Sequence, residues 1–202
     1  MENVLESDMS PDERTYESEL WKKWTKAGGI SRFLALRFWR TAGKFSIDIG
    51  ESGDDGLRGS TKVFANAVSL ATFLKAVQSG QHLELYPEDE RAKLPAGAYM
   101  YYGGTQVGGK DISRILKIVH WQVGGTPDPN SFAWKAGHFP ARRPTTGAYI
   151  PDLSNPLSQH SIKVTRTDMA ELSTLLNLAL VQHAASTRDA ETWVKEITGK
   201  SR

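Results

Sequence analysis

Apolar residues recur at every second position along much of the chain, which is the pattern of β-strands with one buried face. Two neighbouring segments, residues 31–42 and 44–50, show this alternation most clearly. In the first segment, Leu34, Leu36 and Phe38 lie on one side and the residues between them lie on the other. A short link of small residues separates the two segments. The pattern therefore predicts a β-hairpin with one apolar face and one mixed face.

Further strands are predicted where short apolar runs end at glycine, proline or polar residues. They cover residues 62–65, 82–86, 98–102, 113–123, 131–139 and 161–165. Segment 51–60, rich in glycine and aspartate, is predicted to be a loop, and segment 140–156 a long irregular surface loop. Residues 17–26 place Leu20, Trp21 and Trp24 at helical spacing. That spacing indicates either a helix docked on the domain or an arm that grips a neighbouring subunit.

Two stretches that lie far apart in the chain follow the same plan. Each begins with a strand segment containing Lys-Val and continues into an apolar helical pattern: STKVFANAVSLATFLKAVQSG at residues 60–80, and SIKVTRTDMAELSTLLNLALVQH at residues 161–183. The first helix is expected to start at the capping residue Asn66 and to stop at Gly80. Such a repeat of strand and helix indicates a domain made of two similar halves.

Both predicted helices carry a broad apolar surface. The second is expected to be capped by Thr165 or Thr167, with Asp168 in its first turn, where the helix dipole favours an anion. The residues expected on the buried faces are Val68, Ala71, Leu74 and Val77 in the first helix, and Leu172, Leu175, Leu176 and Ala179 in the second. The additional apolar residues are Leu70, Phe73, Leu178, Leu180 and Val181. This breadth suits burial against a sheet and against other subunits, or a deep core in a monomer.

The order of the elements is several strands, a helix, several strands and a helix. Because the links between strands are too short for parallel crossovers, this order predicts an α+β domain with mostly antiparallel sheets. The predicted domain covers residues 20–186, preceded by an acidic disordered arm over residues 1–19 and followed by a charged tail over residues 187–202.

Composition narrows the classes of protein that the chain could belong to. Its 202 residues include no cysteine, which excludes disulfides and thiolate metal sites. No apolar run approaches the roughly 20 residues of a membrane span. The N-terminus lacks signal-peptide and transit-peptide patterns, so we expect an intracellular protein, cytoplasmic or nucleoid-associated. Residues 1–19 carry a net charge of −6, and the total of +2 therefore leaves +8 for the remainder, which suits a polyanionic partner.

The order of elements resembles the Whirly family of single-stranded DNA-binding proteins over roughly residues 31–186. The matching stretches are residues 62–80 with 82–86, then 111–121, then 161–185. The family's Lys-Gly-Lys-Ala-Ala-Leu signature is absent, and residues 31–39 read SRFLALRFW in its place.

This resemblance implies a Whirly-like repeat of two antiparallel four-stranded β-sheets, each followed by a helix. It also implies a homotetramer with its helices near the centre, and nucleic acid bound along the sheet surfaces. The expected roles are replication, DNA recombination and DNA repair. Kinetoplastid guide-RNA-binding proteins share the architecture, so the resemblance extends to RNA-binding as well as to DNA-binding proteins.

Single strands are bound by basic surfaces that follow the backbone and by aromatic rings on which bases stack. The candidate nucleic-acid-binding residues are Arg37, Trp39, Arg40, Lys44, Lys117, Trp121, Trp134, Lys135, Arg142 and Arg143, with Tyr99 and Tyr101 as further candidates. Among these, Trp39 and Trp134 are predicted to be the stacking platforms because each has basic neighbours. Phe38 and Phe45 are predicted to lie in the core.

No catalytic, metal or cofactor motif is recognisable. The five histidines show no pair at ligand spacing on one helix, and no glycine-rich phosphate-binding motif occurs. We therefore expect a non-enzymatic protein that binds single-stranded nucleic acid with little sequence specificity, with DNA favoured over RNA. Two alternatives remain open: an RNA-binding or annealing factor of the same architecture, and a protein-interaction scaffold.

Overall fold

Two antiparallel β-sheets, each followed by an α-helix, make up the part of the chain that the structure describes. This computed structural model describes residues 17–39, 44–82, 99–145 and 149–187. The first half consists of β1 (Glu17–Ala27), β2 (Ile30–Trp39), β3 (Lys44–Gly53), β4 (Gly56–Asn66) and α2 (Ala67–Ser79). The second half consists of β5 (Tyr99–Val107), β6 (Lys110–Val123), β7 (Thr126–Arg142), β8 (Ile150–Pro151), β9 (Ser158–Thr165) and α4 (Arg166–Thr187). The predicted α+β class and the strand-helix repeat are confirmed.

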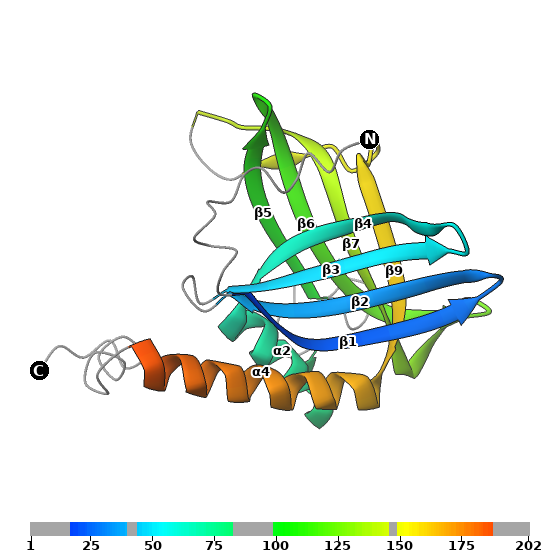
Figure 1. Cartoon of the computed structure of the whole chain (residues 1–202), viewed down its shortest axis with the longest axis vertical. Helices are drawn as coiled ribbons and strands as arrows, with labels where there is room; N and C mark the ends of the chain where they lie inside the picture. The colour runs from blue at the N-terminus through cyan, green and yellow to red at the C-terminus, as the bar shows by residue number, and fades with distance from the viewer. Residues whose placement is uncertain (1–16, 40–43, 83–98, 146–148, 188–202) are drawn as a thin grey trace, which may run out of the picture.

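The first sheet has four strands in the order β1-β2-β3-β4, and the second has five, in the order β5-β6-β7-β8 with β9 also paired to β7. The strand beyond the predicted four is the two-residue β8, which pairs with the end of β7. Strands of the first sheet run across those of the second, and the two helices lie together beneath them (Figure 1). The sheets approach each other where β4 contacts β6, β7 and β9.

The prediction of a helix at residues 17–26 is wrong, because this segment is the strand β1. It pairs with β2 along its length, and a register shift between Glu19 and Trp21 interrupts the alternation. Trp21 pairs with Leu36 and is buried, whereas Trp24 pairs with Phe33 and is exposed. The irregularity gave the apolar residues an apparent helical spacing.

Two other boundaries differ from the predictions, and one predicted strand lies almost entirely outside the described residues. Segment 51–60 is not a loop: β3 and β4 continue through it to a tight turn between Gly53 and Gly56. In segment 140–156, β7 extends to Arg142 and β8 forms, so part of the predicted irregular region is paired. Of the predicted strand 82–86, only His82 is described, and it does not lie in a strand.

Helix α2 starts and stops at the predicted capping residues. The Asn66 side chain accepts a hydrogen bond from the Ser69 N–H at 2.9 Å. At the other end of α2, Gly80 adopts a positive φ of 78°, and Gln81 N–H donates to the Ala76 carbonyl at 2.8 Å. These contacts form a Schellman turn, which only glycine adopts without strain. No helix in the described ranges is long and apolar enough to cross a membrane.

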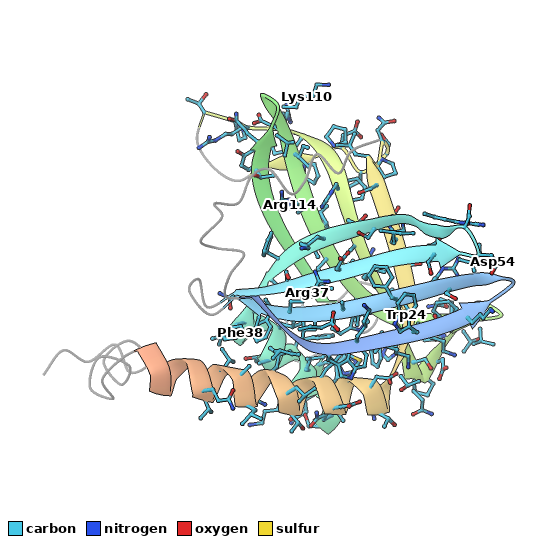
Figure 2. All side chains as sticks on the ribbon, viewed as in Figure 1. Trp24, Arg37, Phe38, Asp54, Lys110 and Arg114 are labelled. Carbon is cyan, nitrogen blue, oxygen red and sulfur yellow. The ribbon has the colours of Figure 1, made fainter. Side chains whose placement is uncertain are left out.

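The core lies between the two sheets and the helices. Phe38, labelled in Figure 2, stacks on Phe45 with ring centroids 4.8 Å apart, and both are buried as predicted. Most of the predicted helix faces are buried as well, and Leu74 of α2 is completely inaccessible. Two predicted residues differ: Val68 is 65% exposed, because the buried stripe starts at Ala67 instead, and Leu175 is only partly buried.

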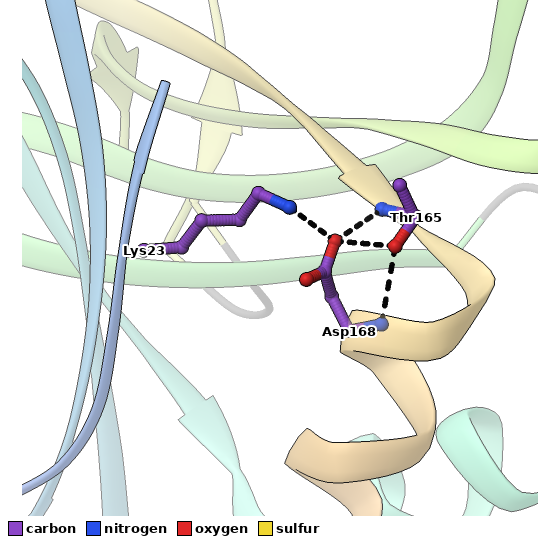
Figure 3. A network of polar contacts seen from close by, with 3 residues as sticks. All are labelled: Lys23, Thr165 and Asp168. Carbon is purple, nitrogen blue, oxygen red and sulfur yellow. Dashed lines mark hydrogen bonds and ion pairs between the residues drawn. The ribbon is translucent and has the colours of Figure 1, made fainter.

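Thr165 is the cap of α4, and Asp168 ties this helix to β1 (Figure 3). The Asp168 carboxylate accepts hydrogen bonds from the Thr165 N–H at 2.7 Å and the Thr165 hydroxyl at 2.6 Å. It also forms an ion pair with Lys23 of β1. Burial by itself disfavours ionisation of Asp168, but the hydrogen bonds from Lys23 and Thr165 outweigh it and hold the pKa of this carboxyl below its ordinary value.

We expect Asp168→Asn to lower the free energy of unfolding by about 1–3 kcal/mol at neutral pH, because Lys23 loses its anion in a partly buried position. A depressed carboxyl pKa stabilises the fold above the ordinary value of 3.8, and this stabilisation is lost as the pH falls through the lower folded value. The difference between wild type and variant should therefore shrink in acid. Urea titrations at neutral pH and in acid measure this difference in the free energy of unfolding. Asp55→Asn is the control, since Asp55 pairs with Arg58 on the surface, and an equal loss in both variants would contradict the prediction.

Candidate nucleic-acid interface

The outer surface of the second sheet, opposite the core, gathers three lysines and a tryptophan. Lys117 of β6 lies directly opposite Lys135 of β7, and Lys163 of β9 lies diagonally from Lys135 because its own partner is Ala133. The ammonium group of Lys163 lies 5.5 Å from the ring centre of Trp121. We call these four residues the lysine face. The structure thus brings together the predicted residues Lys117, Trp121 and Lys135.

The lysine face combines positive charge with little compensation. Within the described part of the chain, neither Lys117 nor Lys135 has an acidic partner, whereas Lys163 pairs with Asp128 at 3.7 Å. A hydrogen bond from the Asn130 backbone and another from Ser131 lower the pKa of Asp128. Like charges directly opposite each other on a sheet are destabilising by roughly 0.2–1 kcal/mol. Repulsion between Lys117 and Lys135 therefore destabilises the sheet, and a bound anion would reduce this repulsion.

Tyr149 and two arginines lie at the opposite end of this surface. The Tyr149 ring lies over Gly104, where an added Cβ would lie 1.8 Å from it, so any larger residue would displace the ring. The guanidinium carbon of Arg143 lies 5.6 Å from the Tyr149 ring centre, and Arg142 pairs with Ile150 of β8. Both arginines are exposed, but they lie at the far end of β7 from Trp121 and outside the lysine face.

A smaller aromatic group, the Trp24 cluster, lies on the outer surface of the first sheet. It consists of Trp24, Phe33 and Lys22 (Figure 2 labels Trp24). The rings of Trp24 and Phe33 have centroids 5.2 Å apart, and the Lys22 ammonium group lies 5.3 Å and 5.6 Å from them. Trp24 is 51% exposed, so its ring is open to a stacking partner.

The other candidate residues of the first sheet are less exposed to solvent or lie outside the described residues. Arg37 lies between two acids, 3.7 Å from Glu19 and 3.9 Å from Asp48, and is partly buried. The register pairs Trp39 with Lys44, but their side chains, and the whole of Arg40, lie outside the described residues. The same holds for the side chains of Tyr99 and Tyr101.

The prediction that Trp134 is a stacking platform is wrong, because its side chain is completely buried. In the register it lies between Ile118 and Ile162 on the core side of the second sheet. Alternation correctly placed Trp134 on the face opposite Lys135. The sequence did not show which of these two faces the helices and the first sheet would cover.

Four residues of these surfaces were not recognised from the sequence: Lys163, Lys22, Trp24 and Phe33. Polar and apolar residues alternate around Lys163, and it occurs on a predicted strand. Only the β7–β9 register, however, places it beside Trp121. Lys22 and Trp24 belong to the basic, aromatic run KKWTK, which could have identified them. The helical interpretation of that segment concealed the face that they share.

The described residues include no group of three or more histidines, cysteines or acids that could hold a metal ion. His138 and His160 lie between the sheets: His138 Nε2 contacts the Lys62 carbonyl at 2.7 Å, and His160 Nδ1 contacts the Thr61 hydroxyl at 2.8 Å. Burial lowers the pKa of both imidazoles. They therefore add neutral hydrogen-bonding groups to this interior at neutral pH, and no positive charge to the outer surfaces.

No family model matches the chain, and no curated protein matches it in sequence. Among solved structures, the chain is similar to the crystal structure of WHY3 from Arabidopsis thaliana, a Whirly protein, with a TM-score of 0.48 and 10% sequence identity. The similarity covers 89% of this chain and 97% of that chain. At this identity, a function for the chain has to be argued from its own surfaces.

Proposed function

We propose that this protein binds single-stranded nucleic acid on the lysine face. The observation that carries the proposal is the placement of Lys117 directly opposite Lys135, with Lys163 and Trp121 beside them. Uncompensated like charges on neighbouring strands destabilise a sheet, and a phosphate backbone supplies the missing negative charge.

The chemistry of this surface suits binding without sequence readout. The lysines contact phosphates as point charges, and Trp121 offers a ring for a base, each stacked base contributing about 1–3 kcal/mol. A row of ammonium groups beside one indole contains few groups that could distinguish one base from another. The Trp24 cluster provides a second stacking position on the first sheet. In this proposal the protein is a non-catalytic binder that requires no cofactor and protects or organises DNA during replication, recombination or repair.

Self-association is part of the proposal. Val68 of α2, and Leu178 and Val181 of α4, are large apolar residues that are more than half exposed on the single chain. Helix surfaces of this kind suit contact with further copies, which supports the predicted homotetramer. A tetramer would present four lysine faces to one long strand and raise the affinity through multivalency.

The test measures binding and mass together, using the full chain freed of nucleic acid. Fluorescence anisotropy compares labelled single-stranded DNA, RNA of the same sequence and duplex DNA over a range of salt concentrations. We expect single strands to bind more tightly than duplex, and DNA more tightly than RNA. For three lysine contacts, log K should fall with log salt with a slope of about −2 for each protomer engaged.

Native mass measurement with and without the oligonucleotide tests the tetramer in the same samples. Tighter binding of RNA would assign the protein to the RNA-binding alternative. Absence of binding at low salt, combined with assembly through the helices, would favour a protein-interaction scaffold and would contradict the proposed function.

A further inference from the structure

Two histidines join the end of α2 to β6 directly beneath the lysine face. His82 follows the Schellman turn that ends α2, and its Nε2 lies 3.3 Å from Nε2 of His120 on β6. His82 is only 5% exposed. The Phe132 ring stacks on His120 at 4.6 Å, and the edges of Phe73 and Phe132 enclose His82. His120 immediately precedes Trp121, at the point where the pairing of β6 with β7 shifts register.

The contacts assign the protons of this pair when both imidazoles are neutral. Nδ1 of His120 lies 3.2 Å from the Asp128 carbonyl, which can only accept, so this nitrogen carries a proton and Nε2 of His120 has a lone pair. Nε2 of His82 must then donate to it. That leaves Nδ1 of His82 as an unprotonated nitrogen, and this buried atom has no hydrogen-bond partner among the described residues.

A further proton cannot be accommodated without breaking this arrangement. If His82 takes it, Nδ1 becomes a buried N–H donor without an acceptor. If His120 takes it, His82 must shift its own proton to Nδ1, and the same unsatisfied donor results. Among the described residues, the other charged group acting on His82 is Arg166 at the start of α4, which also opposes a positive charge, while α2 and β7 contribute only the aromatic rings.

We propose that the contact between His82 and His120 is an acid-sensitive latch, closed at neutral pH, that holds the end of α2 against β6 and supports Trp121 on the opposite face of the sheet. Protonation opens the latch and loosens β6 at the register shift. The consequence for nucleic acid rests on the proposed function: affinity falls in acid. A surface that binds only through lysines would bind equally well or more tightly as its histidines gain charge.

The direction of the pH dependence follows from the burial. Burial, then the charges of His120 and Arg166, lower the pKa of His82 below its ordinary value of 6.5. The folded protein therefore resists protonation more than the open form does. The stabilisation that neutral His82 contributes is fully present above pH 6.5. It is lost as the pH falls from there towards the lower pKa of His82 in the folded protein.

Hydrogen exchange tests the latch without any nucleic acid. Between about pH 8 and pH 5, amide exchange in residues 117–121 of the wild type, corrected for intrinsic rates, should accelerate by up to about tenfold per pH unit below 6.5.

His82→Gln and His82→Phe remove the titrating group, and the second fills the same aromatic surroundings. Both should abolish this pH dependence, whereas His160→Gln, at a histidine elsewhere in the fold, should retain it. All measurements include a chelator, so metal binding by imidazoles does not contribute. A pH dependence that persists in both His82 variants would overturn the latch.

Anisotropy with a single-stranded oligonucleotide at the same pH values tests the link to binding. Wild-type affinity should fall in acid, and that of the His82 variants should not. If exchange behaves as expected but affinity does not fall, the support of Trp121 by the latch is refuted. If the wild type does not bind at any pH, the proposed function fails, while the exchange measurement still decides on the latch.

Discussion

Replacing Lys117 and Lys135 together by alanine is expected to weaken binding of single-stranded DNA and to reduce the salt slope by about 1.4, because two phosphate contacts are lost. The same variant should be as stable as the wild type or slightly more stable, since the opposed charges are removed. Trp121→Ala in addition should reduce affinity by a further factor of about 5 to 150, corresponding to 1–3 kcal/mol for one stacked base. Salt titrations by anisotropy and urea unfolding curves measure the two effects separately.

The control is the double variant Lys75→Ala and Lys110→Ala, which changes the net charge by the same amount. Lys75 lies on the exposed side of α2, and Lys110 lies at the tip of the β5–β6 hairpin, at the opposite end of β6 from Trp121 (Figure 2 labels Lys110). This control should keep most of the affinity. Equal weakening in the two double variants would show that binding depends on net charge and not on the lysine face.

Leu74→Asp is expected to abolish the cooperative fold. Leu74 has no exposed surface, and it belongs to the cluster of α2, α4 and both sheets. Removing such a side chain by Leu→Ala costs about 2–5 kcal/mol, and burying an unpaired carboxylate adds several more. The sum is comparable to the whole stability of a typical domain, about 5–15 kcal/mol. Circular dichroism and thermal unfolding should show no native transition.

Val68→Asp, on the same helix, is the matched control. Val68 is 65% exposed, so the substitution should leave the fold of the single chain intact. If α2 contacts other subunits, the same change should lower the mass in solution while circular dichroism is retained. Loss of the fold in the Val68 variant, or a native transition in the Leu74 variant, would contradict the burial of α2 in this structure.

The strands and helices with regular patterns were predictable, because local chemistry alone specifies them. Asn66 and Gly80 mark the ends of α2 through hydrogen bonds made within a few residues of each. Prediction failed where the pattern was irregular or the decisive partner was distant in sequence. The register shift in β1 gave a strand the spacing of a helix, and the hairpin at Gly53 and Gly56 continued through a segment whose composition is typical of a loop.

The sequence by itself determined the α+β class, the two strand-helix halves, and the grouping of Lys117 with Trp121 and of Trp134 with Phe132, because side-chain parity follows from backbone geometry. Only the tertiary structure decided which of these two groups lies on the outer surface of the second sheet. Trp134 lies beneath the first sheet and the helices, and Lys163 reaches Trp121 because β9 pairs with β7. Alternation assigns residues to two faces, but burial of one face requires a partner layer that is remote in the chain.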